Sequence, residues 1–385
     1  MSRQSRRQFM ERCAVLGGGL GSLACLGMGC GPTERQQPVR STEISERSPP
    51  ENAGEDDEML PGYVKLHRRG ELKARGEALW NRLTPCKLCP RACGVDRLAG
   101  EKGFCQAGSD LVISSHHPHF GEEPPLVGSG GSGTVFFSHC GLRCVFCINY
   151  EISLFGQGAK RSIEDLGQMM LNLQERGCHN INVVTPSHYS PYIVLALDQA
   201  AARGLKLPLV YNTCGWEQME ILALLSGVVD IYLADFKYAC GEMAMKYSTC
   251  VPPDTRYLES EAGQRYSSTE VYPQLTQAAL LEMNRQVGVA QPDEEGLLHR
   301  GLIIRHLVMP DNVGGADEVL RWIARNLPKD TYVNLMSQYT PTYRADEFPE
   351  INRRITRDEY REAVAVAEEE GLTNVEIQGF RYFLF

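Results

Sequence analysis

The sequence lacks an excess of positive charge, a phosphate-binding loop and an unbroken apolar run near its N-terminus. Its 39 Lys and Arg residues are outnumbered by 48 Asp and Glu, which gives a net charge of −9 and a pI near 5.6. Bulk electrostatics therefore give no reason to expect nucleic acid or an anionic membrane as a partner. The glycine run at 128–133 lacks the Lys-Ser/Thr pair of a phosphate loop, and the apolar stretch at 13–28 is too interrupted for a stable transmembrane helix.

The cysteine pattern also lacks the even distribution of a disulfide framework. Removing the three cysteines before residue 31 from the total of 14 leaves 11, an odd number, and seven of these fall in two tight clusters. Such clustering predicts metal ligands rather than disulfides. With 43% hydrophobic and 23% charged residues among 385, the chain can bury a full-sized core and suits one large domain with a small appendage.

The Cys140 set consists of Cys140, Cys144 and Cys147, spaced C-x3-C-x2-C after an apolar run at 134–137 that predicts a strand. Three thiolates can hold a 4Fe-4S cube by three of its irons and leave the fourth iron free for a substrate ligand. The alternatives are a zinc site that recruits His139 as a further ligand, or a set of structural thiols. The position favours the cluster, because α/β barrels keep their active sites at the carboxyl ends of their strands.

The Cys86 set consists of Cys86, Cys89, Cys93 and Cys105, spaced C-x2-C-x3-C-x11-C. Four thiolates indicate a closed site, which could hold a second iron-sulfur cluster or a structural zinc. An auxiliary cluster would relay electrons or anchor substrate, whereas zinc would only stabilise a small lobe.

The first 58 residues differ in character from the rest. Residues 1–30 contain Ser-Arg-Arg-Gln-Phe-Met, which is typical of a twin-arginine export signal, and Cys30 suggests a lipid anchor. Residues 31–58 are predicted to be a disordered linker, because they carry almost no large apolar side chains. A cysteine-rich lobe is expected at 59–125 and the main domain at 126–385. The signal predicts export to the periplasm or a membrane anchor, with retention in the cytoplasm as the alternative.

From residue 134 onward, strand and helix patterns alternate about six times. Helix boundaries are predicted at Ser162, at Ser190-Pro191 and at a Thr356-x-x-Glu359 capping box. Strands are expected at 180–184, 209–211, 231–234, 302–308 and 332–335. This alternation predicts an α/β fold with a parallel sheet whose six units curl into a partial barrel.

Two polar segments fall outside this alternation. Residues 116–125 contain three histidines and two glutamates, and are expected either to contact substrate or to form a solvated loop over the barrel mouth. Residues 250–272 are expected to be an irregular surface insertion.

These motifs resemble the radical S-adenosylmethionine (SAM) superfamily, and residues 86–371 are similar to the pyruvate formate-lyase activating enzyme and to a poorly characterised subgroup of its relatives. The stretches that carry the resemblance are CKLCPRACGVDR, GEEPPLVGSGGSG, CVFCINYEIS, HNINVVTPSHY, VYNTCGWE, YLADFKY, IIRHLVMP and NLMSQYTP. The resemblance implies a partial (β/α)6 radical-SAM barrel with a 4Fe-4S cluster on the Cys140 set. In that family the free iron chelates the amino and carboxylate groups of SAM, and one electron breaks the sulfonium bond to give a 5'-deoxyadenosyl radical.

The resemblance also implies roles for single residues. Asp235 and Lys237 match a D-x-K motif, in which the lysine meets the SAM carboxylate and the aspartate helps to hold a monovalent cation. A flexible ammonium suits a single carboxylate contact. Asn212 and Thr213 match other polar contacts at that cation site, and Arg305 matches a basic position on the fifth strand.

Three further positions are compared with the family pattern. Phe146 matches the aromatic residue before the third cysteine. Thr185 stands where other members carry a Gly-Gly-Glu motif for the SAM amino group, and Ile148 stands where many relatives have glutamine. The implied partners are SAM, a flavodoxin or ferredoxin-like electron donor and a substrate, for which a glycine in a partner protein is one candidate.

Two functions follow from these patterns. The first is a radical SAM enzyme that abstracts hydrogen from an unidentified substrate. The second is an exported, non-catalytic iron-sulfur protein for electron transfer or binding. Asp235 and Lys237 favour the enzyme, because an electron carrier needs no SAM pocket. Export favours the alternative, because SAM and strong reductants are cytoplasmic.

Overall fold

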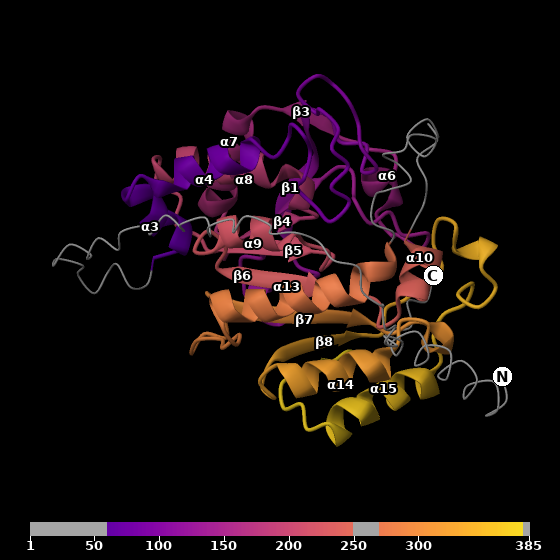
Figure 1. Cartoon of the computed structure of the whole chain (residues 1–385). Helices are drawn as coiled ribbons and strands as arrows, with labels where there is room; N and C mark the ends of the chain where they lie inside the picture. The colour runs from indigo at the N-terminus through magenta and orange to yellow at the C-terminus, as the bar shows by residue number, and fades with distance from the viewer. Residues whose placement is uncertain (1–59, 249–268, 380–385) are drawn as a thin grey trace, which may run out of the picture. The chain divides into compact units, whose positions relative to one another are not determined.

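In the residues that it describes, 60–248 and 269–379, the computed structural model is built around one nine-stranded sheet (Figure 1). From edge to edge the strands are β3 (Ala159–Arg161), β1 (Leu111–His119), β2 (Ser132–Phe137), β4 (Ile181–Val184), β5 (Leu209–Thr213), β6 (Ile231–Asp235), β7 (Gly301–Leu307), β8 (Tyr332–Met336) and β9 (Val375–Ile377). The predicted export signal at 1–30, the linker at 31–58 and most of the insertion at 250–272 lie outside the described residues.

Most of the sheet is parallel. Each neighbouring pair from β2 to β9 runs parallel, whereas β1 is antiparallel to both β2 and β3. The prediction of an α/β fold with a parallel sheet is therefore confirmed. Parallel strands place their carboxyl ends at one edge of the sheet, so the segments that follow β2, β4, β5 and β6 meet there.

Helices connect the parallel strands. The longer ones are α7 (Ile163–Glu175), α8 (Ser190–Ala201), α13 (Tyr272–Val287), α14 (Ala316–Asn326) and α15 (Arg357–Glu369), and α4 (Glu71–Trp80) precedes the sheet. Shorter helices are α3 (Gly62–Arg68), α5 (Pro124–Val127), α6 (Tyr150–Ser153), α9 (Met219–Leu225), α10 (Gly241–Tyr247), η1 (Ser187–Tyr189), η2 (Thr269–Val271), η3 (Pro310–Asn312) and η4 (Ala345–Glu347). None of the helices in the described ranges is long and apolar enough to cross a membrane.

Two helix starts form the capping boxes that their sequences favour. The Ser162 hydroxyl accepts from the backbone N–H of Asp165, whose carboxylate accepts from the N–H of Ser162. The predicted Thr356 and Glu359 pair does the same at α15. Each box satisfies two backbone donors that a helix start leaves without partners.

The two faces of the sheet have different neighbours. Alternate strand residues such as Val183, Tyr211 and Tyr232 belong to the large core formed with the helices. On the other face, Val210, Ile231, Leu233 and Ile303 belong to a smaller cluster with Leu126 of α5, Ala290 and Leu298. Side chains two residues apart along a strand share a face. Asn212, Asp235 and Arg305 therefore lie on the face that α5 covers.

The expectation of a solvated loop at 116–125 is wrong for its histidines. His116, His117 and His119 belong to β1, which pairs with β2 from Ile113 opposite Phe137 to His119 opposite Ser132. The His117 ring stacks on Phe136, with 5.6 Å between ring centroids. The histidine stretch is a strand because β2 pairs with it along its whole length, whereas β3 pairs only with Leu111–Ile113 at the start of β1.

Candidate functional site

The Cys140 set lies in the loop that follows β2. Its backbone curls through positive φ angles at His139 (74°) and Arg143 (56°), which non-glycine residues seldom adopt. Each sulfur has a polar neighbour. The Leu142 N–H lies 3.4 Å from Cys140 Sγ, the Ser248 hydroxyl 3.1 Å from Cys144 Sγ and the Ser153 hydroxyl 3.1 Å from Cys147 Sγ. These are hydrogen bonds that thiolates can accept.

The surroundings of the three thiols change their acidity in different directions. A hydrogen bond with the thiol of Cys214 lowers the pKa of Cys140. Burial raises the pKa of Cys144 to about 12 and also raises that of Cys147. The positive charge of the Lys237 ammonium stabilises all three thiolates, and it therefore opposes the effect of burial on their pKa values. Lys237 is therefore the positive charge that the three sulfurs share.

Asp235 ends β6 and Lys237 follows it directly. Lys237 Nζ donates to Asp235 Oδ2 at 2.5 Å, and about a fifth of each side chain is exposed (19% and 22%). Burial alone would lower the pKa of Lys237, but attraction to Asp235 and Cys144 raises it above its ordinary value. The structure thus brings the predicted D-x-K pair to the Cys140 set with its ammonium charged.

The two polar residues at the end of β5 lie on different faces. Asn212 is buried on the face that also holds Asp235, and its backbone oxygen accepts from the N–H of Thr185 at 2.9 Å. The Thr213 hydroxyl instead donates to the carboxylate of Glu217. Thr185 has a positive φ of 57°, which is rare for a β-branched residue. Asn212 and Thr185 are thus adjacent, whereas Thr213 faces the helices.

Arg305 of β7 is bound by carboxylates. It donates to Glu122, and Nε donates to Glu123 Oε1 at 2.6 Å. Asn334 Nδ2 of β8 also donates to Glu123 Oε1, at 2.8 Å. Glu123 is fully buried, so this part of the segment at 116–125 packs on the face of the sheet that α5 covers rather than meeting solvent.

Phe146 packs inside the protein. Its ring lies edge-on to Tyr238 and Tyr339, with centroids 6.4 and 5.8 Å away. The ring is buried, so it anchors the cysteine loop in the core.

The Cys86 set forms a second group of neighbouring thiols. Cys86 and Cys93 are hydrogen bonded to each other through their sulfurs, and this contact lowers the pKa of Cys86. Burial raises the pKa values of Cys89 and Cys105, and both lie close enough to Cys86 for its charge to add to this effect. The buried guanidinium of Arg97 is the positive charge next to Cys86 and Cys105.

Arg91 joins the two sets. Its guanidinium lies 3.7 Å from the centroid of the Phe104 ring and 4.7 Å from that of Trp216, and its Nε donates to the backbone oxygen of Gly141 at 3.1 Å. Cys105 lies close enough to Cys140 for the charge of the Cys140 thiolate to raise the pKa of Cys105. The Cys86 set is therefore packed directly against the Cys140 loop.

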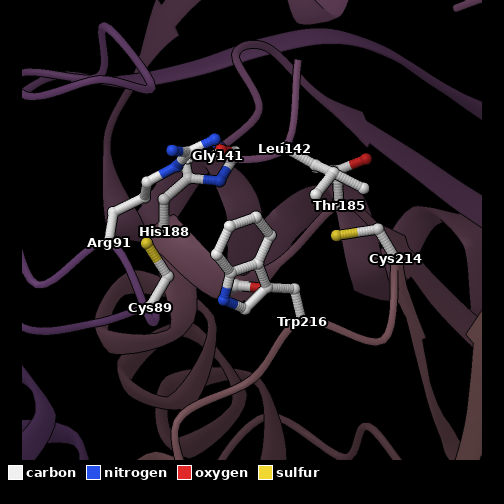
Figure 2. Close-up of a pocket in the computed structure, with 9 residues that line it drawn as sticks. Cys89, Arg91, Gly141, Leu142, Thr185, His188, Cys214 and Trp216 are labelled. Atoms are coloured by element: carbon white, nitrogen blue, oxygen red, sulfur yellow. Dashed lines mark hydrogen bonds between the residues drawn. The ribbon is translucent and has the colours of Figure 1, made fainter. Parts of the chain in front are cut away.

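A cavity opens at this junction (Figure 2). Its lining is Cys89, Arg91, Gly141, Leu142, Thr185, Ser187, His188, Cys214 and Trp216. The sulfur atoms of Cys89 and Cys214 point toward it from opposite sides of the Trp216 ring. The cavity thus connects one residue of the Cys86 set, the Cys140 loop and the ends of β4 and β5.

Comparison with known proteins gives one informative relative. No family model matches the chain. Over 318 residues, which are 80% of this chain and 81% of the other, it is 30% identical to uncharacterized protein MJ0674 of Methanocaldococcus jannaschii. The chain belongs to the MJ0674 family. The description of that relative names no activity, so the function has to be inferred from the site.

In this member of the MJ0674 family, no three His, Cys, Asp or Glu side chains among the described residues form a group that could hold a single metal ion. An iron-sulfur cube spreads its cysteine ligands over separate irons, so its thiols need not converge on one point. The Cys140 set fits such a group in its chemistry, because its sulfurs influence one another's charge and have hydrogen-bonding neighbours. All ten cysteines in the described ranges are free thiols.

Two residues of the MJ0674-family site were missed from the sequence. Glu217 is fully buried, where it accepts from Thr213 and from Ser187 Oγ at 2.5 Å, and burial raises its pKa to about 7. Cys214 reaches Cys140 with its thiol. Its position in the sequence could have indicated Cys214, because it follows Asn212 and Thr213 at the carboxyl end of a strand.

Proposed function

We propose that this protein is a radical SAM enzyme that uses a 4Fe-4S cluster on Cys140, Cys144 and Cys147. The observation that carries the proposal is the position of Lys237. Its ammonium is the shared positive charge of the three thiols, and it is paired with Asp235 at the end of the neighbouring β6 strand. A cation beside a set of three thiols suits a cofactor that brings a carboxylate to the cluster.

The fold supports a partial (β/α)6 barrel for this function. β2, β4, β5, β6, β7 and β8 run parallel, and a helix follows each of them. Asn212, Asp235 and Arg305 share the face that α5 covers, which we assign to the inside of the barrel. The chemistry is then collected at the carboxyl ends of the strands, as in other α/β barrels.

Each residue has a distinct task in this proposal. When bound, the cluster supplies the electron that breaks the sulfonium bond of SAM and yields a 5'-deoxyadenosyl radical. Lys237 holds the SAM carboxylate, and Asp235 orients Lys237 and helps to hold a monovalent cation. Phe146, packed between Tyr238 and Tyr339, keeps water away from the cysteine loop.

The Cys86 set is proposed to hold a second metal centre, either a 4Fe-4S cluster or zinc. The cluster fits better, because no three ligand side chains in the described part of the chain converge on a single ion. Cys86 and Cys105 lie beside the buried Arg97, and the segment packs on the Cys140 loop through Arg91. A cluster that is packed against the first one could relay electrons to it.

The test is SAM cleavage by the reconstituted protein. The chain is loaded with iron and sulfide without oxygen, reduced with dithionite and assayed for 5'-deoxyadenosine. We expect product from the wild type and none from Cys144→Ala. Cys178→Ala serves as the matched control, because Cys178 is a buried thiol that belongs to neither set. A cluster that forms but leaves SAM intact would refute the proposal.

One contact favours the second candidate, a non-catalytic iron-sulfur protein for electron transfer. Cys214 brings a fourth thiol to Cys140, and clusters with four cysteine ligands serve mainly as electron carriers. In that case SAM would neither be cleaved nor change the electron paramagnetic resonance (EPR) spectrum of the reduced cluster.

A further inference from the structure

Cys214 is a thiol beside the Cys140 set that the spacing of the three cysteines does not include. It directly follows β5, and its sulfur is hydrogen bonded to that of Cys140. Both residues are free cysteines, and Cys214 lines the cavity shown in Figure 2. A fourth thiol therefore lies beside the Cys140 set, next to one of its three sulfurs.

The backbone that carries Cys214 is fixed to the strand that carries Asp235. The Tyr272 hydroxyl of α13 donates to the backbone oxygen of Cys214 at 2.9 Å, and the N–H of Lys237 donates to the same hydroxyl at 3.0 Å. Gly215 has a φ of 77°, and a Cβ there would collide with the backbone oxygen of Asp235. The turn requires glycine, and it holds Cys214 in a defined position relative to Lys237.

The Cys86 set is the other group to which Cys214 might have belonged, since Cys89 faces the same cavity. However, the thiols that act on Cys89 are Cys86 and Cys105 of its own set, and its cationic neighbour is Arg91. The sulfur partner of Cys214 is Cys140. Cys214 therefore belongs to the Cys140 set.

We propose that Cys214 is an exchangeable fourth ligand of the cluster on Cys140, Cys144 and Cys147. This inference rests on the proposed function. Without SAM, the Cys214 thiolate bonds to the iron that the other three cysteines leave open. On SAM binding, the bond from iron to the Cys214 sulfur would break, and bonds to the amino nitrogen and a carboxylate oxygen of SAM would form. The SAM ammonium gives up one proton as its nitrogen binds iron, and the released Cys214 thiolate takes up one proton, so protons balance. No electron is transferred in this exchange.

The consequence is a resting cluster without an exposed iron. A 4Fe-4S cluster with an open iron loses that iron on oxidation and leaves a three-iron cluster, whereas four thiolates retain it. The test is to oxidise the anaerobically reconstituted full chain with limiting ferricyanide, with and without SAM, and to follow the three-iron signal by EPR. Wild type, Cys214→Ala and the control Cys178→Ala are compared.

Without SAM, we expect Cys214→Ala to form the three-iron cluster several-fold faster than the wild type and Cys178→Ala. Equal rates in all three proteins would overturn the inference, while SAM cleavage by the wild type would leave the enzyme proposal intact. A faster loss of iron in Cys214→Ala together with no effect of SAM on the wild type would overturn the exchange and the enzyme proposal, and would leave Cys214 as a permanent ligand.

A second variant covers the case in which Cys214→Ala does not assemble a cluster. Cys214→Ser keeps an oxygen ligand, and we expect the reduced cluster to show an EPR spectrum different from that of the wild type without SAM. SAM should make the two spectra the same, because it displaces either residue. Spectra that are identical without SAM would contradict ligation by Cys214.

Discussion

The two cysteine sets are adjacent, but the cation beside each is used differently. Arg97, beside the Cys86 set, is 1% exposed and donates to the backbone oxygens of Gly108 and His188 at 2.6–2.9 Å. Lys237, beside the Cys140 set, is 19% exposed at its side chain and bonds to Asp235. An ammonium has three donors, and the described hydrogen bonds of Lys237 Nζ use one of them.

This difference separates a structural site from a binding site, which cysteine spacing alone does not do. The donors of Arg97 are committed to the backbone, so this guanidinium holds its segment in place. Lys237 retains donors near three thiols and is partly open to solvent, so it can take a ligand. The following predictions test whether the two cations have these separate roles.

The largest expected effect is on stability, at Arg97. Arg97→Ala should lower the free energy of unfolding by about 3–5 kcal/mol, because it leaves buried oxygens and thiols without their charged partner. Urea unfolding of the metal-free chain followed by circular dichroism measures this. Arg97→Lys keeps the charge but not the planar fork, and should recover only part of the loss. A change below about 1 kcal/mol in Arg97→Ala would mean that its contacts contribute little.

Lys237→Ala should weaken SAM binding and leave the free energy of unfolding nearly unchanged. Loss of a charge-assisted hydrogen bond of about 2 kcal/mol weakens SAM binding on the order of 30-fold in Kd. Calorimetric titration of SAM into the anaerobically reconstituted protein gives this Kd, and urea unfolding should differ little from the wild type. Lys160→Ala, which removes an exposed lysine paired with Asp110, is the control. Unchanged SAM affinity in Lys237→Ala would remove the main support for the enzyme.

The sequence was sufficient to predict the elements whose signals are local. Ser162 and Thr356 start helices because their caps involve residues only three positions away. β1 was missed because its run of histidines and proline shows no alternation, and its strand conformation depends on pairing with β2 and β3. α13 was missed because it follows an irregular insertion that hides its start at Tyr272.

The same distinction holds at the site. The Cys140 set could be predicted because its three cysteines are neighbours in sequence. The contact between Cys214 and Cys140 depends on β2, β4 and β5 lying side by side, and no local pattern encodes it. The separation of Asn212 from Thr213 follows instead from the alternation of side chains along a strand, which places Thr213 on the helix side with Glu217.

His188, which lies between the two cysteine sets, should make the free energy of unfolding depend on pH. Its Nε2 bonds to the backbone oxygen of Ser138 at 2.8 Å, its own backbone oxygen accepts from Arg97, and burial lowers its pKa from 6.5 to about 3. The unfolded chain therefore binds the proton more readily. The contribution of His188 to stability is complete above pH 6.5 and is lost as pH falls toward 3, by about 2 kcal/mol at pH 5.

Urea unfolding at pH 7 and pH 5 tests this directly. His188→Gln should be less stable than the wild type at pH 7, but should lose about 2 kcal/mol less between the two values. The exposed His299 is the control, and His299→Gln should keep the pH dependence of the wild type. The same slope in His188→Gln and in the wild type would show that other groups cause the acid sensitivity.

The smallest expected effect distinguishes the two sets by reduction potential. Ser248 Oγ lies 3.1 Å from Cys144 Sγ and 2.8 Å from the Tyr238 hydroxyl, so the serine can donate to the thiolate. Hydrogen bonds to cluster sulfurs stabilise the more negative, reduced state. Ser248→Ala should therefore lower the potential of the cluster on the Cys140 set by roughly 40 mV, the one-electron equivalent of a hydrogen bond of about 1 kcal/mol.

A redox titration followed by EPR measures this shift. Ser153→Ala, which removes the hydroxyl beside Cys147, should lower the potential in the same direction, and any signal from the Cys86 set should stay unchanged in both variants. If both signals shifted together, the two serines would act through the packing between the sets rather than on the sulfurs. The Cys140 set could then not be tuned separately from the Cys86 set, and the division between a binding site and a structural site would fail.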